Sequence, residues 1–322
     1  MVFRTVRLLA AFAGSLLFVA GWASGASARS SARSVPRWAS HGFIVFKYLD
    51  SLAQIRPGSE SGGILVGGPA EHTLGPHTPW DPALSPNGRF LAFRGYYKPF
   101  AEGSYALYIL HLRTGKFRRA TQSIAGDPSW SPDGKWIAFD TSGGGEVWKV
   151  RASGGKPVRL TQRGPNAVGD ATPTWSPNGR QIAFVRWVHQ RGQIWVMRSN
   201  GHDAHPIHSD NHFSDSSPAW SHDGTRIAFV IRHRNHATLE VMNANGRHRR
   251  DLPSPRPNAW NPVWLPYDTG IGFLGGDASH GSGNLFVMRP DGRDVYQLTH
   301  WHGPARTEQF AWTGARLLSG RC

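Results

Sequence analysis

SerTrpSerProAspGlyLysTrpIleAlaPhe, at Ser129–Phe139, recurs along the chain with almost the same letters. Its first tryptophan is Trp130, and Leu84 holds the equivalent place in the repeat before it. The later equivalents follow at nearly even steps, and they are Trp175, Trp220, Trp264 and Trp312. A regular spacing of this length is typical of a propeller, a solenoid or another array of stacked units.

One repeat predicts four short strands. Ser129–Ser131 is a first strand, Pro132–Gly134 is a tight turn, and Trp136–Asp140 is a second strand. Glu146–Val150 alternates as a third strand, and Pro157–Thr161 is a fourth. Four antiparallel strands per repeat make one propeller blade. No run after Gly25 has a helical period, so we expect an all-β fold.

The two ends of the chain predict how the array closes. Gly42–Lys47, Leu52–Arg56 and Ile64–Val66 match the second, third and fourth strands of a blade that lacks its first strand. Glu308–Trp312 resembles a first strand with no blade after it. We therefore expect a six-bladed β-propeller of four-stranded antiparallel blades, its ring closed by pairing of the C-terminal strand with the N-terminal blade. This single domain is expected over residues 42–322, after a linker at 29–41.

The recurring tryptophans have two interpretations. One aromatic at a fixed place in each blade is typical of packing between neighbouring blades, and a set of aromatics can also form a ligand-binding box. We expect packing, because each tryptophan is followed at once by a tight turn.

The repeat also resembles a known family. The pattern Asp-x-x-Pro-x-Trp-Ser-Pro-Asp-Gly-x-x-Ile-Ala-Phe, seen at Asp170–Phe184 and Asp215–Phe229, resembles the WD40-like repeat of TolB-type β-propellers. The likeness covers residues 42–319 and implies the propeller fold. Such blades serve periplasmic scaffold proteins, the propeller halves of serine peptidases and many secreted proteins, so the resemblance alone does not select a function. TolB carries an α/β domain before its propeller and the peptidases carry a hydrolase domain; we expect neither here.

The segment at 1–28 predicts export. Arg4 and Arg7 precede an apolar run at Leu8–Ala23, and AlaSerAla at 26–28 offers small residues for cleavage. This order is typical of a secretory signal peptide at 1–28, which indicates a periplasmic or extracellular protein. The alternative is an uncleaved segment, which would be the protein's only contact with a membrane. The single cysteine, Cys322, excludes an internal disulfide.

The chain is strongly basic. It has 36 basic and 21 acidic residues, and removal of Arg4 and Arg7 with the signal peptide leaves 34 minus 21, or +13. Arginine dominates the basic residues, and its planar fork suits phosphate and carboxylate groups. A GC-rich genome is an alternative explanation for the choice of arginine, but it does not explain the sign of the net charge.

Histidine and arginine gather in one set of predicted loops. In a propeller, the loops that enter each first strand lie on the same face as those that join second to third strands. We predict a partner-binding surface there, for an envelope protein or an anionic polymer. Its candidate residues are His77, Trp80, His189, Arg191, His212, His233, Arg234, His236, Trp260, His280, His300, Trp301 and His302.

Four aspartates stand where the chain enters the innermost strands on this same face. They are Asp81, Asp127, Asp170 and Asp215. We expect their carboxylates to brace the start of each blade through local backbone hydrogen bonds, as repeated aspartates often do.

Metal binding and catalysis find little support in the sequence. The close histidine pairs at 233–236 and 300–302 lack zinc-ligand spacing, so we assign no metal and no cofactor. The chain has no Gly-x-Ser-x-Gly elbow and no phosphate-binding glycine loop, so we assign no catalytic residue. We expect a monomeric, non-catalytic binding module that does not bind nucleic acid. The alternative is a propeller hydrolase or lyase that uses histidines and aspartates on its loops.

We predict that the mature chain begins close to Arg29, because the charged, apolar and small-residue segments before it match a cleaved signal peptide. Amino-terminal sequencing of secreted protein is the measurement. Recovery of Met1 would instead indicate an uncleaved segment.

Overall fold

The computed structural model describes residues 36, 39, 43–48, 51–57, 62–67, 77–96, 105–121, 125–141, 145–162, 164, 166–208, 213–254, 258–277, 282–300 and 310–313. Their regular structure is β-strand apart from short 3-10 turns such as η3 (Pro266–Asp268), which confirms the all-β class. No helix among these residues is long and apolar enough to cross a membrane. The predicted signal peptide at 1–28 lies outside the described residues, as does most of the linker.

The strands form four-stranded antiparallel units. The unit that joins the two ends of the chain consists of β24 (Phe310–Thr313), β1 (Phe43–Tyr48), β2 (Ser51–Ile55) and β3 (Gly62–Gly67). The next two units are β4 (His77–Leu84), β5 (Phe90–Tyr96), β6 (Ala106–His111) and β7 (Phe117–Arg119), then β8 (Gly126–Trp130), β9 (Trp136–Asp140), β10 (Val147–Arg151) and β11 (Val158–Arg159).

The second half of the chain continues this order. Its strands are β12 (Ala167–Trp175), β13 (Gln181–Val188), β14 (Arg191–Arg198), β15 (His205–His208), β16 (Ser214–Trp220), β17 (Arg226–Arg232), β18 (Ala237–Asn243), β19 (Arg250–Leu252), β20 (Asn258–Trp264), β21 (Ile271–Asp277), β22 (Ser282–Met288) and β23 (Tyr296–Gln297). The β16–β19 and β20–β23 units belong to one sheet, because Ala237 pairs in parallel with Asn258.

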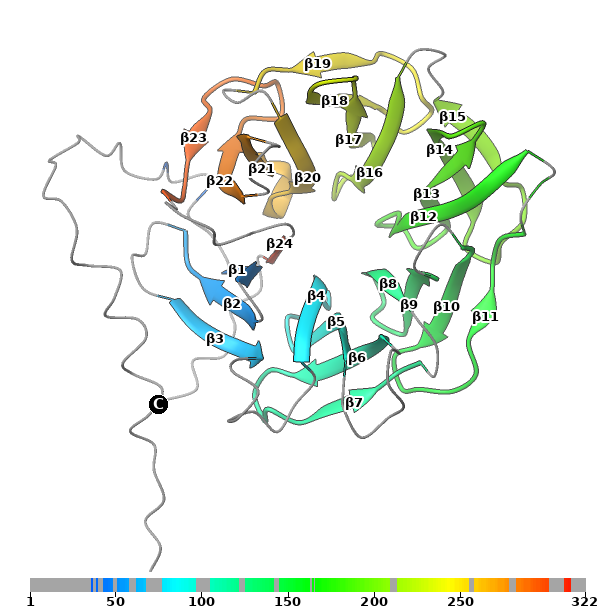
Figure 1. Cartoon of the computed structure of the whole chain (residues 1–322), viewed down its shortest axis with the longest axis vertical. Helices are drawn as coiled ribbons and strands as arrows, with labels where there is room; N and C mark the ends of the chain where they lie inside the picture. The colour runs from blue at the N-terminus through cyan, green and yellow to red at the C-terminus, as the bar shows by residue number, and fades with distance from the viewer. Residues whose placement is uncertain are drawn as a thin grey trace, which may run out of the picture.

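The units are arranged around a common centre. Figure 1 shows the first strand of successive units, such as β4, β8, β12, β16 and β20, nearest that centre, with the later strands outside. This is the arrangement of a β-propeller, and each four-stranded unit is called a blade below. Two faces follow from the antiparallel order. The turn face carries the hairpin turns between first and second and between third and fourth strands. The loop face carries the other connections.

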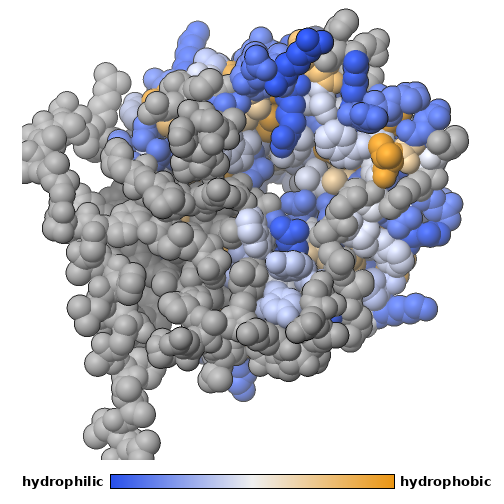
Figure 2. All heavy atoms as spheres, in the orientation of Figure 1, coloured by the Kyte–Doolittle hydropathy of each residue, from blue (hydrophilic) through white to orange (hydrophobic). Residues whose placement is uncertain are grey.

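The visible part of the described surface is mainly hydrophilic. Figure 2, in the orientation of Figure 1, shows hydrophilic residues over the β12–β15 and β16–β19 blades, with only scattered hydrophobic groups among them. The apolar side chains of these strands pack inside instead, as Ile194, Trp220 and Phe229 do in one buried cluster. The polar chemistry of the molecule is therefore presented by its loops and turns.

The first strands begin earlier than the sequence predicts. β9 has the predicted bounds, whereas β8 starts at Gly126 rather than at Ser129. The pairing of β8 with β9 skips residues between Gly126 and Ser129, which marks a β-bulge. Pro128 lies in this bulge, where its missing N–H removes no ladder hydrogen bond. Because a proline normally ends a predicted strand, the sequence does not predict the part of β8 that precedes Pro128.

The bulge recurs with a left-handed residue before each proline. The φ angles of these residues lie between 43° and 54°, and the residues are Asp81, Asp127, Thr172, Ser217 and Asn261. Such a conformation costs about 1–3 kcal/mol for a residue other than glycine and persists only where the surrounding structure fixes it. The repeated bulge therefore fixes how each first strand leaves the loop face.

The tryptophans pack between blades, which confirms their predicted structural role. Trp130 is buried against Ala92 and Leu107 of the preceding blade. Its indole Nε1 donates a hydrogen bond of 3.0 Å to the backbone oxygen of Ala83 in that blade. Trp264 donates in the same way to Ala219, again at 3.0 Å. The indoles of Trp130 and Trp264 thus each cover one apolar face of the previous blade and satisfy a carbonyl of its first strand.

The strands from the two ends of the chain pair as predicted. Ile44 of β1 lies opposite Trp312 of β24, and Phe46 lies opposite Phe310. Phe310 and Trp312 are buried in one cluster with Leu274 of the β20–β23 blade. The C-terminal strand therefore links the N-terminal blade to the last one.

Deletion of residues 305–322 should lower the melting temperature and promote aggregation, because it removes β24 and exposes the edge of β1. Thermal unfolding and light scattering are the measurements. Deletion of residues 314–322 is the matched control, since it leaves β24 in place and should have little effect. An unchanged melting temperature in the longer deletion would contradict this role for β24.

Candidate functional site

A tight turn on the loop face places two predicted histidines side by side. The backbone N–H of His233 donates to the backbone oxygen of His236 at 2.8 Å, which closes the turn between β17 and β18. The two imidazole rings are stacked, with centroids 4.2 Å apart and planes 7° from parallel. Because the first and fourth residues of a β-turn lie close together, the spacing of these histidines produces the stack.

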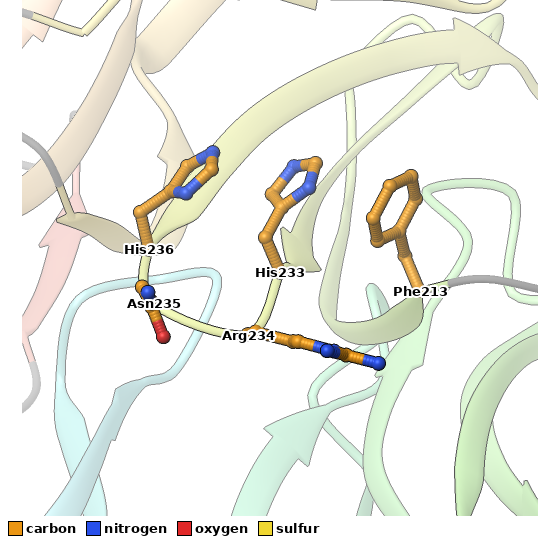
Figure 3. Close-up of a pocket in the computed structure, with 5 residues that line it drawn as sticks. All are labelled: Phe213, His233, Arg234, Asn235 and His236. Atoms are coloured by element: carbon orange, nitrogen blue, oxygen red, sulfur yellow. The ribbon is translucent and has the colours of Figure 1, made fainter.

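Phe213, directly before β16, extends this stack. Its ring centroid lies 4.2 Å from that of His233, with 56° between the planes. His233 Nε2 also lies 3.2 Å from the hydroxyl of Thr238, which orients the half-buried imidazole. Figure 3 shows Phe213, His233 and His236 side by side, with the Arg234 side chain extending beneath the rings.

These residues line an open pocket of about 490 Å³, and we call it the aromatic pocket. Its lining residues are Phe213, His233, Arg234, Asn235 and His236. Three of the five are basic or can become so, and none is acidic. Arg234 and His236 are exposed, so their donors face the solvent. An exposed guanidinium beside two imidazoles can donate hydrogen bonds to a carboxylate or a phosphate and offset its charge.

A buried polar network lies on the strands beside the aromatic pocket. Asp215, two residues after Phe213, is fully buried, and its Oδ2 lies 2.7 Å from Nδ1 of His208. Nε2 of His208 lies 2.7 Å from a guanidinium nitrogen of Arg249. Because the guanidinium can only donate, Nε2 must accept and Nδ1 carries the proton toward Asp215. Both ring nitrogens of His208 therefore have partners in this network.

Arg249 connects this network to Glu240. Its Nε lies 2.8 Å from Oε2 of the buried Glu240 side chain. Burial raises the pKa of the Glu240 carboxyl to about 7, the neighbouring Asp251 adds to the rise, and Arg249 acts in the opposite direction. The network joins β15 of one blade to β16, β18 and the turn before β19 of the next.

The four loop-face aspartates do not share one role: Asp170 and Asp215 bind side chains rather than the local backbone groups that the sequence predicted. Asp170 forms a two-pronged ion pair with Arg186 of the adjacent strand, at 2.7 and 2.8 Å. Asp215 binds His208, as described above. Both precede their prolines by three residues, whereas Asp81 and Asp127 directly precede theirs. Strand pairing and the bulge, rather than local turns, decide these partners.

Asp81 and Asp127 lie at a central cavity of about 770 Å³ lined by the first strands. Asp81 pairs with Arg94 at 3.0 Å and accepts the backbone N–H of Asp127 at 3.3 Å. Burial and the Asp81 and Asp140 carboxylates raise the pKa of Asp127 well above its usual range. Burial also raises the pKa of Asp140 to about 6. Within the part of the chain that the structure describes, no group of three His, Cys, Asp or Glu residues could hold a metal ion.

The other predicted residues are dispersed over the loop face. His189 and Arg191 are exposed at the turn between β13 and β14, where His189 has a φ of 48°. The Arg94 guanidinium lies over the Trp80 ring, with its Cζ atom 5.7 Å from the ring centroid. Trp260 is half-buried against the apolar clusters of its blade.

The remaining predicted residues lie at the ends of the described segments or beyond them. His300 is exposed after β23, and His77 opens β4 without a described side chain. The residues outside the described part are His212, His280, Trp301 and His302. Nothing in the sequence selects Phe213, Asn235 or His208, since each becomes informative only through a neighbour on another strand.

The repeat and this architecture match a family model. The model of the TolB beta propeller domain matches residues 76–268 and 170–319. The chain belongs to the TolB β-propeller family. The predicted resemblance is thereby confirmed.

Solved structures of other proteins share this fold at low identity. TolB from Acinetobacter baumannii is similar with a TM-score of 0.70 and 20% identity, over 85% of this chain and 67% of that chain. A chain of a nidogen/laminin complex is similar with a TM-score of 0.64 and 12% identity, over 83% of this chain and 97% of that one. An uncharacterized protein of Agrobacterium fabrum is 28% identical over 107 residues. That match covers 32% of this chain and 34% of the length of the relative. At these identities the structural likeness concerns the fold.

Glu240→Gln should make stability less dependent on pH. Because the folded pKa of Glu240 is about 7 against a usual 4.5, the folded state binds the extra proton between these values. The free energy of unfolding therefore falls as the pH rises through this window, and a glutamine removes that contribution. Thermal unfolding of the wild type and the variant at about pH 5 and about pH 8 is the measurement.

Glu146→Gln, in the β8–β11 blade, is the matched control that removes a glutamate carboxylate from another blade. The raised pKa values of Asp127 and Asp140 change stability with pH in the same direction as that of Glu240. The contribution of Glu240 is therefore the difference between the pH profiles of the wild type and the Glu240→Gln variant. Parallel pH profiles for Glu240→Gln and the wild type would contradict the assignment.

Proposed function

We propose that this protein is an exported, non-catalytic binding module whose loop face docks an acidic protein or an anionic polymer of the cell envelope. The observation that carries the proposal is the aromatic pocket, in which two stacked imidazoles, a phenyl ring and an exposed guanidinium converge without any acidic residue. Rigid rings supply contact area at little entropic cost, and the cationic groups supply orientation toward an anion.

Export rests on the sequence of the segment at 1–28. Outside the cell, a net charge of +13 raises the local concentration of anionic partners and speeds their encounter with the protein. A periplasmic or extracellular location and a monomeric state complete the proposal.

The proposed scaffold for this surface is a closed ring of six blades. The pairing of β1 with β24 supports it, because the C-terminal strand then supplies the first strand that the N-terminal blade lacks. A closed ring would hold the separate loops of the loop face in fixed relative positions.

The arrangement of His208 favours a binding role over the alternative of a hydrolase or lyase. A histidine paired with a buried aspartate is a familiar catalytic arrangement, but such a base needs a free ring nitrogen facing its reactant. Here Nδ1 of His208 meets Asp215, and Nε2 meets Arg249. This pair therefore braces the blades.

The triple variant Arg191→Ser, Arg234→Ser, His236→Ser should bind anionic partners about tenfold more weakly at low salt, since charged contacts of this kind contribute about 0.2–1 kcal/mol each. Poly-L-glutamate is the defined probe, and capture from envelope extract at low and high salt is the second measurement. Wild-type binding should tighten as the pH falls through about 6.5, where imidazole gains its charge.

The control variant Arg180→Ser, Arg247→Ser, His202→Ser removes the same residue types from the turn face. All three of these side chains are exposed. The control should bind as the wild type does. Equal binding by wild type and test variant, with no dependence on salt or pH, would refute the loop-face proposal.

A further inference from the structure

A second cationic surface lies on the turn face, on the opposite side from the aromatic pocket. It is formed by the hairpin turns of the β4–β7 and β8–β11 blades, and we call it the basic rim. Its residues are Arg89, Arg113, Lys116, Arg118, Lys135, Arg151 and Lys156. None of them belongs to the predicted partner-binding set.

Backbone hydrogen bonds hold the two turns of each blade together. In the β4–β7 blade, the N–H of Leu112 donates to the oxygen of Arg89 at 2.9 Å. In the β8–β11 blade, the N–H of Ala152 donates to the oxygen of Lys135 at 2.7 Å. The basic residues of each pair of turns are therefore fixed close to one another.

Arg118 connects the two blades. Its guanidinium NH1 lies 3.5 Å from the position that a Cβ on Gly154 would occupy, in the turn between β10 and β11. Gly154 has a φ of 102°, which glycine adopts without strain. The Arg118 guanidinium therefore lies against this turn of the neighbouring blade. The basic rim is thus continuous across the junction.

Trp136 positions the cations at the inner side of the basic rim. The Arg151 guanidinium lies 4.6 Å from its ring centroid, and the Lys149 ammonium lies 4.9 Å from it. Lys149 also donates to the backbone oxygen of Ser199 at 2.7 Å. Because both cations cover the indole, Trp136 offers no exposed aromatic anchor to a protein partner.

The basic rim has almost no acidic counterpart among the described residues. Asp133 is the one acidic residue in these turns, and its carboxylate already accepts the Ser131 hydroxyl at 2.6 Å and the Lys135 N–H at 3.0 Å. It lies 3.9 Å from the Lys135 ammonium at the edge of the set. Seven basic groups thus face one acidic group.

Arginines in the turns of two other blades pair with acids of the same turn. Arg198 pairs with Asp203 at 2.6 Å in the β12–β15 blade. Arg289 and Arg293 lie 3.4 and 3.8 Å from aspartates of their own turn in the β20–β23 blade. In those turns the positive charges are therefore neutralised by nearby aspartates, whereas at the basic rim they are not. The high net charge of the protein alone does not explain why the unpaired cations gather at the basic rim.

We propose that the basic rim binds a flexible polymer of phosphate groups. A row of guanidinium and ammonium groups is complementary in charge to a chain of phosphates. Each arginine can also donate two parallel hydrogen bonds to one phosphate group. A flexible chain can follow cations that come from two neighbouring blades. The protein-interface alternative is less favoured, since such interfaces centre on exposed aromatic or apolar anchors.

The test measures binding of two end-labelled probes by fluorescence anisotropy. One is an oligodeoxythymidylate, and the other is a long-chain polyphosphate, which shares the phosphates but lacks bases. The variant Lys116→Gln, Arg151→Gln, Lys156→Gln should weaken binding of both at least tenfold at about 50 mM salt. For the oligonucleotide, the slope of log affinity against log salt should fall in magnitude by about 2, or about 0.7 for each lost cation.

The matched control is Arg198→Gln, Arg289→Gln, Arg293→Gln. It also removes three positive charges, but from turns that carry their own acids. It should change affinity by less than about twofold, since charges already offset by partners contribute little. Equal weakening in both variants would show a general charge effect and overturn the proposal. Thermal unfolding confirms that both variants fold.

Three further outcomes would also overturn the proposal. They are binding of the oligonucleotide without polyphosphate, which would indicate base recognition; binding of neither probe; and binding only to vesicles of anionic phospholipid. The loop-face triple variant should retain the wild-type affinity for polyphosphate. Failure of the basic rim is therefore distinguishable from failure of the loop-face proposal.

Discussion

The rest of this structure depends on the contact between each recurring tryptophan and the blade before it. A four-stranded sheet has two apolar faces, and a single blade cannot bury either of them alone. The indole of Trp130 covers the Ala92 and Leu107 side of its neighbour and also bonds the carbonyl of Ala83. Repetition of this contact stacks the blades side by side, because each blade supplies the cover that the previous one needs.

The bulge in each first strand links this packing to the loop face. A residue with left-handed φ before proline, such as Asp127, turns the strand where it leaves that face. Polar residues then come from neighbouring blades into one place, as Asp81 does when it accepts the N–H of Asp127. The packing order of the blades thus sets the electrostatics of the central cavity.

The two faces handle charge in different ways. On the loop face, buried Asp81 and Asp170 pair with arginines of the adjacent strand. In the aromatic pocket of the same face, the Arg234 side chain stays exposed. On the turn face, Arg198 and Arg289 pair with aspartates of their own turns, whereas the cations of the basic rim are largely unmatched. The unequal distribution within equivalent turns makes each surface chemically distinct on one repeated scaffold.

The sequence by itself determined the blade. The spacing of the tryptophans, the Ser-Pro-Asp-Gly turns and the alternating strands are local features, so Trp136–Asp140 could be read directly as β9. The sequence also identified His233, Arg234 and His236, because a short turn brings its own residues together. The tertiary structure alone decided that Phe213 completes their pocket and that Arg249 contacts His208. Those partners lie on different strands, and Arg118 reaches Gly154 in the neighbouring blade. Contacts between strands depend on register and on blade packing, which no local pattern of residues records.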